Sequence, residues 1–272
     1  MKFNIYIIFL IYSILLSCSV SKKTNLQSVG LNIIVDIEVD KLGDYYTISS
    51  NGSVNKYHAE KKLFTYSNSF EGVLAAVDVT NPHKLLLFYP EQQTILLLDN
   101  SLSQISKIVL KSTTYYSAVG MANDGNIWVY DSYLAKLKKI DSTGRELDES
   151  FPIGQYYPED IVNSKIIDRG NYVIMADSKE GILLFNNMGY FDKKLLFQNV
   201  SKPTILKNTL YFFDIKNNCF ISKKLDAFSN SDSLCFDNFN IHPKRVIFEN
   251  SKFYLLENNK VSVFDGDYFS GK

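Results

Sequence analysis

Short runs of apolar residues recur along the chain, separated by segments rich in Asn, Asp, Gly and Ser. In runs such as 85–88 and 210–213 every position is apolar, whereas a strand with one wet face would alternate. Such runs predict strands that are covered on both faces. The chain also has 18 Tyr and 19 Phe, residue types that favour strands.

These runs come in pairs that align at a regular spacing. The second runs of successive pairs end at His58, Asp99, Asp141, Asn186, Leu225 and Asp265. The steps between these positions are 41, 42, 45, 39 and 40 residues. A period near 40 residues with four short strands per unit predicts a β-propeller.

Six such units fit the chain. In the third unit we expect four strands, at 117–122, 127–130, 136–140 and 147–153. Gly125 supplies the positive φ for the hairpin between the first two of them. The sixth unit lacks a last strand, and we expect the stretch 26–33 to complete it and close the ring.

The pattern from Val35 to Asp265 resembles the six-bladed propellers of the NHL and TolB-like type. The resemblance implies an all-β fold, a six-bladed β-propeller of four-stranded antiparallel blades. It rests on the strand pattern, because the third strands end in no WD dipeptide and no sialidase-type Asp-box occurs.

The amino terminus predicts export. An apolar run at 3–16 follows Lys2 and ends in Ser17-Cys18, the layout of a secretory signal. The small residue before Cys18 resembles the lipobox of bacterial lipoproteins. That resemblance implies cleavage before Cys18, lipid on Cys18 and a place in the cell envelope. Because Ser19 and not Asp follows Cys18, it also favours the outer membrane.

The alternative is an uncleaved anchor, although the run is shorter than the roughly 20 residues that span a bilayer. The division that follows is a signal peptide at 1–17, the lipidated Cys18 with a polar tether at 18–30, and the propeller at 31–272.

Charge gives no sign of a nucleic-acid partner. The chain has 29 basic and 29 acidic residues, and removal of Lys2 with the signal would leave 28 basic residues. A chain this close to neutral carries no basic excess for nucleic acid or anionic lipid.

Alignment of the inner strands brings several charged residues to one level near the propeller axis. The level contains Glu38, Asp78, Gly120, Lys165, Pro203 and Val246, with Arg245 beside the last. The four charged residues could hold a polar ligand or an ion, or they could pair with one another around trapped water.

Asp36, Glu38 and Asp40 alternate and therefore share one face of the first strand. Three carboxylates could bind Ca²⁺, but such a row is also typical of a solvated face, and Asp40 suits the turn before Gly43. We therefore predict no metal and no cofactor.

Two tyrosine pairs lie in the connectors into blades 3 and 4, Tyr115-Tyr116 and Tyr156-Tyr157. Connectors share one face of the disc with the turns between second and third strands, so the four rings should gather on that face. Clustered exposed Tyr side chains favour binding of protein or sugar. The alternative is that the rings pack between blades.

Cys219 and Cys235 fall on neighbouring antiparallel strands near cross-strand register. They could form a disulfide in an oxidising compartment, or be two small core residues. The carboxylates Asp131, Asp177 and Asp214 recur after second strands, which indicates a turn-forming role in the fold.

Catalytic motifs are absent: the sequence has no Gly-x-Ser-x-Gly, no His-Glu-x-x-His and no P-loop. We therefore expect a non-catalytic envelope lipoprotein that binds a protein partner or acts as a scaffold in an outer-membrane complex. Two alternatives stay open, namely a metal-dependent lactonase- or esterase-like propeller enzyme and a binder of saccharides or peptidoglycan fragments.

Overall fold

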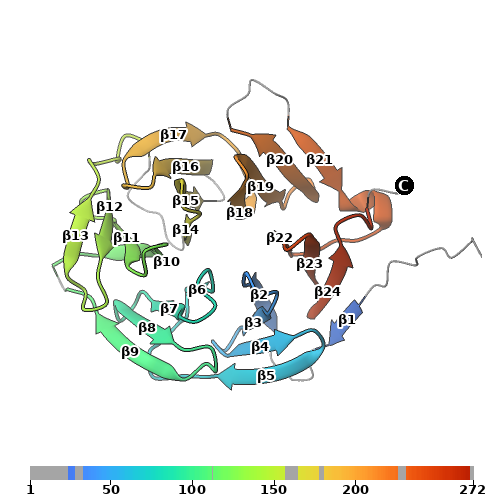
Figure 1. Cartoon of the computed structure of the whole chain (residues 1–272), viewed down its shortest axis with the longest axis horizontal. Coiled ribbons are helices and arrows are strands. Elements are labelled where there is room, and N and C mark those ends of the chain that lie inside the picture. The colour runs from blue at the N-terminus through green and yellow to red at the C-terminus, as the bar shows by residue number, and fades with distance from the viewer. Residues whose placement is uncertain are drawn as a thin grey trace, which may run out of the picture.

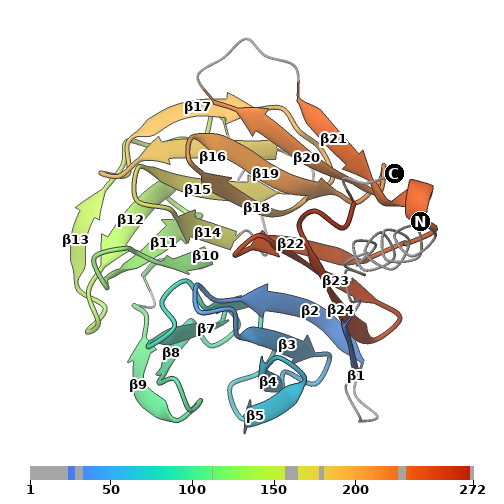
Figure 2. The ribbon, with the colours of Figure 1, turned by 45° about the vertical axis from the view of Figure 1, so that its right-hand side comes forward.

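A computed structural model describes residues 24–27, 33–111, 113–156, 165–177, 181–225 and 231–269. In these ranges the chain forms strands, turns and one short 3₁₀ helix, η1 (Phe236–Phe239). The strands make six four-stranded antiparallel blades around a central axis, as predicted (Figure 1). Figure 2 shows the same ring of blades obliquely, turned by 45° about the vertical axis.

Each blade begins with an inner strand at the axis and ends with an outer strand at the rim. In that order, blades 1 to 3 contain β2 (Ile34–Val39), β3 (Tyr45–Ser49), β4 (Val54–His58) and β5 (Lys61–Tyr66); β6 (Ala76–Asp78), β7 (Leu85–Tyr89), β8 (Thr94–Leu98) and β9 (Gln104–Val109); β10 (Tyr116–Met121), β11 (Ile127–Asp131), β12 (Lys136–Ile140) and β13 (Glu146–Glu149). Blades 4 to 6 contain β14 (Lys165–Asp168), β15 (Tyr172–Asp177), β16 (Gly181–Asn186) and β17 (Phe191–Leu195); β18 (Val200–Leu206), β19 (Thr209–Asp214), β20 (Cys219–Lys224) and β21 (Asp232–Cys235); β22 (Arg245–Glu249), β23 (Lys252–Glu257), β24 (Lys260–Asp265) and β1 (Thr24–Gln27).

The third blade follows its predicted strands closely. Gly125 has a φ of 84° in the hairpin between β10 and β11, as the sequence indicated. The last strand is shorter than expected, because β13 ends at Glu149 while the following connector leaves the sheet. A single parallel pairing of Val119 with Lys165 joins blades 3 and 4 into one continuous sheet.

The ring is closed by a strand from the amino-terminal side of the propeller. Strand β1 pairs antiparallel with β24 as the outermost strand of blade 6, from Thr24 opposite Val263 to Gln27 opposite Lys260. The prediction that this side of the chain completes blade 6 is therefore right. The predicted range 26–33 overlaps this strand only at Leu26 and Gln27, because the pairing begins two residues earlier, within the stretch interpreted as a tether. The division at residues 17 and 30 stays a prediction.

The apolar strands are covered on both faces, as their composition predicted. The core consists of six clusters among the described residues, one at each junction between neighbouring blades. On β7, Leu85 and Leu87 pack toward blade 1, whereas Leu86 and Phe88 pack toward blade 3. A strand such as β7, which lies between two neighbouring blades, therefore has no wet face, and alternation disappears there.

Buried acids also connect the blades and their turns. The Asp168 carboxylate of blade 4 accepts hydrogen bonds from Trp128 Nε1 (3.0 Å) and Asn123 N (3.1 Å) of blade 3. The predicted turn-forming role is confirmed for Asp131, which accepts from Tyr133 N, and for Asp214, which accepts from Lys216 N. These acids serve the fold.

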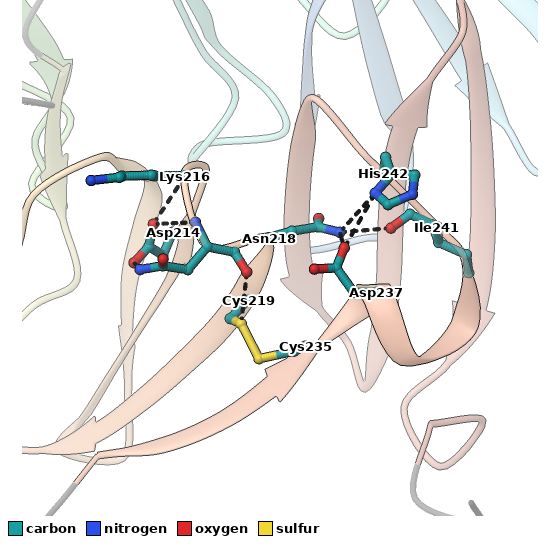
Figure 3. The surroundings of a disulfide bond; sticks show 9 residues. Asp214, Lys216, Asn218, Cys219, Cys235, Asp237, Ile241 and His242 are labelled. Atoms are coloured by element: carbon teal, nitrogen blue, oxygen red, sulfur yellow. Dashed lines mark hydrogen bonds and ion pairs between the residues drawn. A yellow bond between two sulfur atoms is a disulfide. The ribbon is translucent and has the colours of Figure 1, made fainter.

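Cys219 and Cys235 are joined in a disulfide, with their Cα atoms 4.0 Å apart (Figure 3). They are directly opposite each other on β20 and β21. The interpretation as two unbonded core residues is thus wrong, because the two residues face each other across the strands at a Cα distance that lets the sulfur atoms bond. The link fastens β21, the rim strand of blade 5, whose first two residues are exposed.

The disulfide should measurably stabilise the chain. Closing a loop of this length contributes about 3 kcal/mol, so we expect the double variant Cys219→Ala/Cys235→Ala to lose about that much unfolding free energy in urea. Reductant should destabilise the native chain and leave the variant unchanged. Labelling of both thiols by an alkylating reagent in the unreduced native chain would contradict the bond.

Candidate functional site

Three of the four predicted axial charges meet in one ion-pair network. Glu38 on β2 contacts the Nζ atoms of Lys165 and Lys202, the latter at 2.7 Å. Asp36, on the same strand, lies 2.7 Å from Lys202 Nζ and 3.2 Å from Arg245 Nε. The network joins inner strands of blades 1, 4, 5 and 6. Mutual pairing, the second of the two interpretations of this level, accounts for Glu38, Lys165 and Arg245.

Asp78 lies outside this network. Its carboxylate accepts a 2.7 Å hydrogen bond from Met121 N of blade 3 and another from Thr80 N, also 2.7 Å. Asp78 is buried, and its hydrogen bond from Met121 N links blade 2 to blade 3. Its sequence position matches the level of the other three charges, but its side chain makes hydrogen bonds between blades and does not join their ion pairs.

Lys202 is the network member that sequence reasoning missed. Strand β18 changes register between Ser201 and Thr204, and Lys202 has a φ of 51° in this bulge. The extra residue turns Lys202 to the level that the alignment assigned to Pro203. The signal was present in the sequence, since a proline inside an inner strand cannot donate a ladder hydrogen bond and is typical of a bulge.

The acids that could have formed a metal site are already engaged. Asp36 and Glu38 face the cations of the network, and Asp40 accepts hydrogen bonds from Leu42 N (2.9 Å) and Tyr46 Oη (3.0 Å). Within the described ranges no group of three or more His, Cys, Asp and Glu side chains is arranged to hold a metal ion.

Burial and pairing shift the ionisation of the network. Burial opposes charge on Asp36, but Lys202 and Arg245 outweigh it and lower the pKa of the Asp36 carboxyl. Burial likewise opposes charge on Lys202, but Asp36 and Glu38 outweigh it and raise the pKa of the Lys202 amine. Both shifts stabilise the charged pair over the range between the two pKa values.

Beside the network lies a small cavity of about 40 Å³ on the propeller axis. Its polar lining residues are Glu38, Lys41, Thr80, Lys165, Arg169, Lys202, Thr204 and Glu249. Arg169 Nη2 lies 3.4 Å from the Glu249 carboxylate. Burial raises the pKa of Glu249, and Arg169 offsets only part of that effect.

The four predicted tyrosines have different surroundings. Tyr116 is buried in the core between blades 2 and 3, so its interpretation as a binding residue is wrong. Tyr115 is half-buried, with its ring centroid 6.1 Å from that of Tyr133. Tyr156 is 39% exposed and stacks on Phe191 at 4.4 Å. Tyr157 lies outside the described residues, as does Cys18.

Exposed apolar side chains gather on the face that carries the connectors between blades and the turns between second and third strands. We call this the connector face. Nine of the 18 large exposed apolar side chains of the described residues lie there: Ile33, Phe70, Val73, Tyr133, Leu134, Phe151, Tyr156, Leu196 and Ile215. The turns of the opposite face carry three, Leu42, Met188 and Tyr190, and the Tyr190 ring centroid lies 6.3 Å from that of Phe151 at the rim.

Four aromatic residues on the turn and connectors of blade 3, Tyr115, Tyr133, Phe151 and Tyr156, are called the aromatic strip. The Tyr133 ring centroid lies 6.1 Å from that of Tyr115, and the Phe151 ring centroid lies 6.3 Å from that of Tyr190. Tyr133 and Phe151 are 71% and 79% exposed. Ile153 N donates to Ala135 O at 2.7 Å, which holds the connector that carries Phe151 and Tyr156 beside the turn that carries Tyr133. Sequence reasoning found Tyr115 and Tyr156 but missed Tyr133 and Phe151, which stand alone in the sequence and form no pair.

Comparison with known proteins supports the fold. A streptogramin B lyase has a TM-score of 0.59 at 14% identity, with 84% of this chain and 78% of the lyase covered. A virginiamycin B lyase from Staphylococcus aureus, solved with quinupristin, has a TM-score of 0.57 at 12% identity, covering 90% and 99%. A protein of unknown function from Bacteroides caccae has 0.53 at 10% identity, covering 86% and 82%.

At identities this low, the likeness shows the propeller fold alone. No family model matches the chain, and no curated protein matches it. Among the described residues, no helix has the length and apolar character needed to cross a membrane.

The axial network predicts a pH-dependent effect of Lys202→Met. At neutral pH the variant leaves Asp36 and Glu38 short of a cation, and we expect a loss of about 3 kcal/mol in unfolding free energy. Because the pKa of Asp36 is lowered in the fold, its contribution exists above the ordinary carboxyl pKa and disappears as the pH falls through the folded value. The difference from the native chain should therefore shrink in acid.

Urea unfolding at neutral and acidic pH measures this difference. Lys107→Met is the matched control, because Lys107 forms an exposed pair with Glu71 and such pairs contribute about 0–1 kcal/mol. An equal loss from Lys202→Met at both pH values would show that packing, and not charge, is responsible.

Proposed function

We propose that this chain is a non-catalytic protein of the cell envelope, anchored by lipid on Cys18, that binds a protein partner through its connector face. The observation that carries the proposal is the exposure of the aromatic strip. Large exposed aromatic side chains supply much of the binding free energy at protein interfaces, and they cost little conformational entropy on binding. A scaffold role in an outer-membrane complex follows from the same interpretation together with the predicted lipid anchor.

The metal-dependent enzyme has less support. The axial cavity is lined by Lys41, Lys165, Arg169 and Lys202, and by only two acids, Glu38 and Glu249. Cations at this density repel a divalent metal ion. The three histidines, His58, His83 and His242, are exposed and do not line the cavity, so the cavity offers no imidazole as a general base or metal ligand.

A saccharide binder has one observation in its favour. A pocket of about 340 Å³ at the junction of blades 6 and 1 is lined by Tyr45, Tyr254, His58 and Asn250, among others. Aromatic rings beside polar groups suit a sugar. Saturable binding of peptidoglycan fragments that is lost in Asn250→Ala would favour this function over protein binding.

The protein-binding proposal predicts that the double variant Tyr133→Ala/Phe151→Ala loses its partner. Aromatic residues at the centre of an interface often contribute about 2 kcal/mol or more each, so we expect affinity to fall at least about 30-fold. Both rings are largely exposed, so unfolding free energy should change by less than about 0.5 kcal/mol per site. Tyr116 is unsuitable for this test because its loss would open the core.

The measurement is affinity purification of the full-length chain from gently solubilised envelopes, followed by mass spectrometry. Ile105→Ala is the matched control, since Ile105 is a large apolar residue that is 54% exposed but lies on the rim strand β9. A stoichiometric partner that the control retains and the double variant loses supports the proposal. A native chain that purifies alone, or equal capture by the double variant, contradicts it.

A further inference from the structure

The axial cavity has properties that partner binding on the connector face does not use. It is lined by inner strands and turns of blades 1, 2, 4, 5 and 6, is partly open, and has a volume of about 40 Å³. A single water needs roughly 10–15 Å³ measured in this way, so the space holds a few waters. A sugar or a peptide is too large, whereas an ion of a few heavy atoms fits.

The cavity carries more positive than negative charge. Four bases and two acids line it; Glu38 is shared between Lys165 and Lys202, and Lys202 is also paired with Asp36, which does not line the cavity. Glu249 has Arg169 as its partner, and Lys41, an exposed residue, has no ion pair within the described part of the chain. Burial raises the pKa of Glu249. The excess of basic over acidic side chains around the cavity favours binding of an anion.

Two residues that line the cavity also carry a buried polar atom without a hydrogen-bond partner in the described structure. Thr204 is 6% exposed, and its Oγ1 atom forms no hydrogen bond in the described structure. Arg169 Nε is buried and likewise unpaired, although the other side of the guanidinium contacts Glu249. An unpaired buried donor costs about 1–3 kcal/mol. A hydroxyl and a guanidinium N–H beside two lysines are the donors that an oxyanion uses.

We propose that the axial cavity binds a small oxyanion of the phosphate or sulfate type, held by Arg169 and Thr204 with Lys165 and Lys202 supplying charge. Neither the exposure of the connector face nor a lipid anchor is needed for this site. The anion would be either free in solution or the terminal phosphate of a larger molecule that reaches the cavity past Lys41.

Isothermal titration calorimetry on the full-length chain in mild detergent tests the site. The probes are inorganic phosphate, sulfate and glycerol 1-phosphate, each titrated in chloride buffer of equal ionic strength. We expect saturable binding of phosphate or sulfate with one site per chain. Tighter binding of glycerol 1-phosphate than of inorganic phosphate would identify a phosphate ester as the ligand, and the reverse would identify the free anion.

Two cavity variants locate the binding. Thr204→Val keeps the shape and removes the hydroxyl, and should weaken binding about tenfold, as expected for a hydrogen bond to a charged group. Arg169→Gln/Glu249→Gln removes both partners of an ion pair, so that no buried carboxylate is left alone, and should weaken it at least as much. Arg145→Gln, at an exposed pair with Asp141, is the control and should bind as the native chain does.

Two results would overturn the proposal. One is a native chain that takes up neither phosphate, sulfate nor glycerol 1-phosphate beyond its response to chloride. The other is saturable binding that both cavity variants retain, which would place the anion elsewhere. If the double variant fails to fold, Thr204→Val alone decides, because it is isosteric and leaves every ion pair in place.

Discussion

The fold depends on one constraint, which is that each blade must be covered by its two neighbours. Leu86 and Phe88 pack on one side of β7 while Leu85 and Leu87 pack on the other, so no blade can bury its apolar surface alone. The same constraint requires closure, because an open ring would leave the outer faces of the first and last blades wet. Strand β1 meets this need by joining the two ends of the propeller in blade 6.

The apolar clusters hold neighbouring blades together, and polar side chains connect the inner strands at the axis. The inner strands surround the axis, and apart from the single pairing of Val119 with Lys165 no ladder connects one blade to the next in the described structure. Ion pairs from Asp36 and Glu38 take the place of such ladders. Buried ion pairs contribute little net stability, but they penalise any arrangement that leaves a charge alone. The network thus favours one packing of the six blades over its alternatives.

The sequence was sufficient for the architecture and insufficient for the site. Period and composition are properties of long segments, so the six blades and the strands of blade 3 could be predicted. Which residues lie at the axial level can be predicted only if the inner strands are regular. The bulge at Lys202 adds one residue to β18 and so replaces Pro203 by Lys202 at that level. Whether Tyr116 packs inward while Tyr156 is exposed depends on the path of a connector, which has no periodic signal. Phe151 escaped notice for the same reason.

The place of β1 also bears on how the molecule would be oriented in an envelope. β1 begins at Thr24, only six residues after Cys18, and a chain of six residues spans at most about 20 Å. A lipid on Cys18 would therefore keep the rim of blade 6 against the bilayer. Blade 3 lies across the ring from blade 6 (Figure 1). The aromatic strip would therefore be separated from the membrane by about the full diameter of the propeller. A short tether at the rim of blade 6 would leave the opposite rim accessible for binding a large partner.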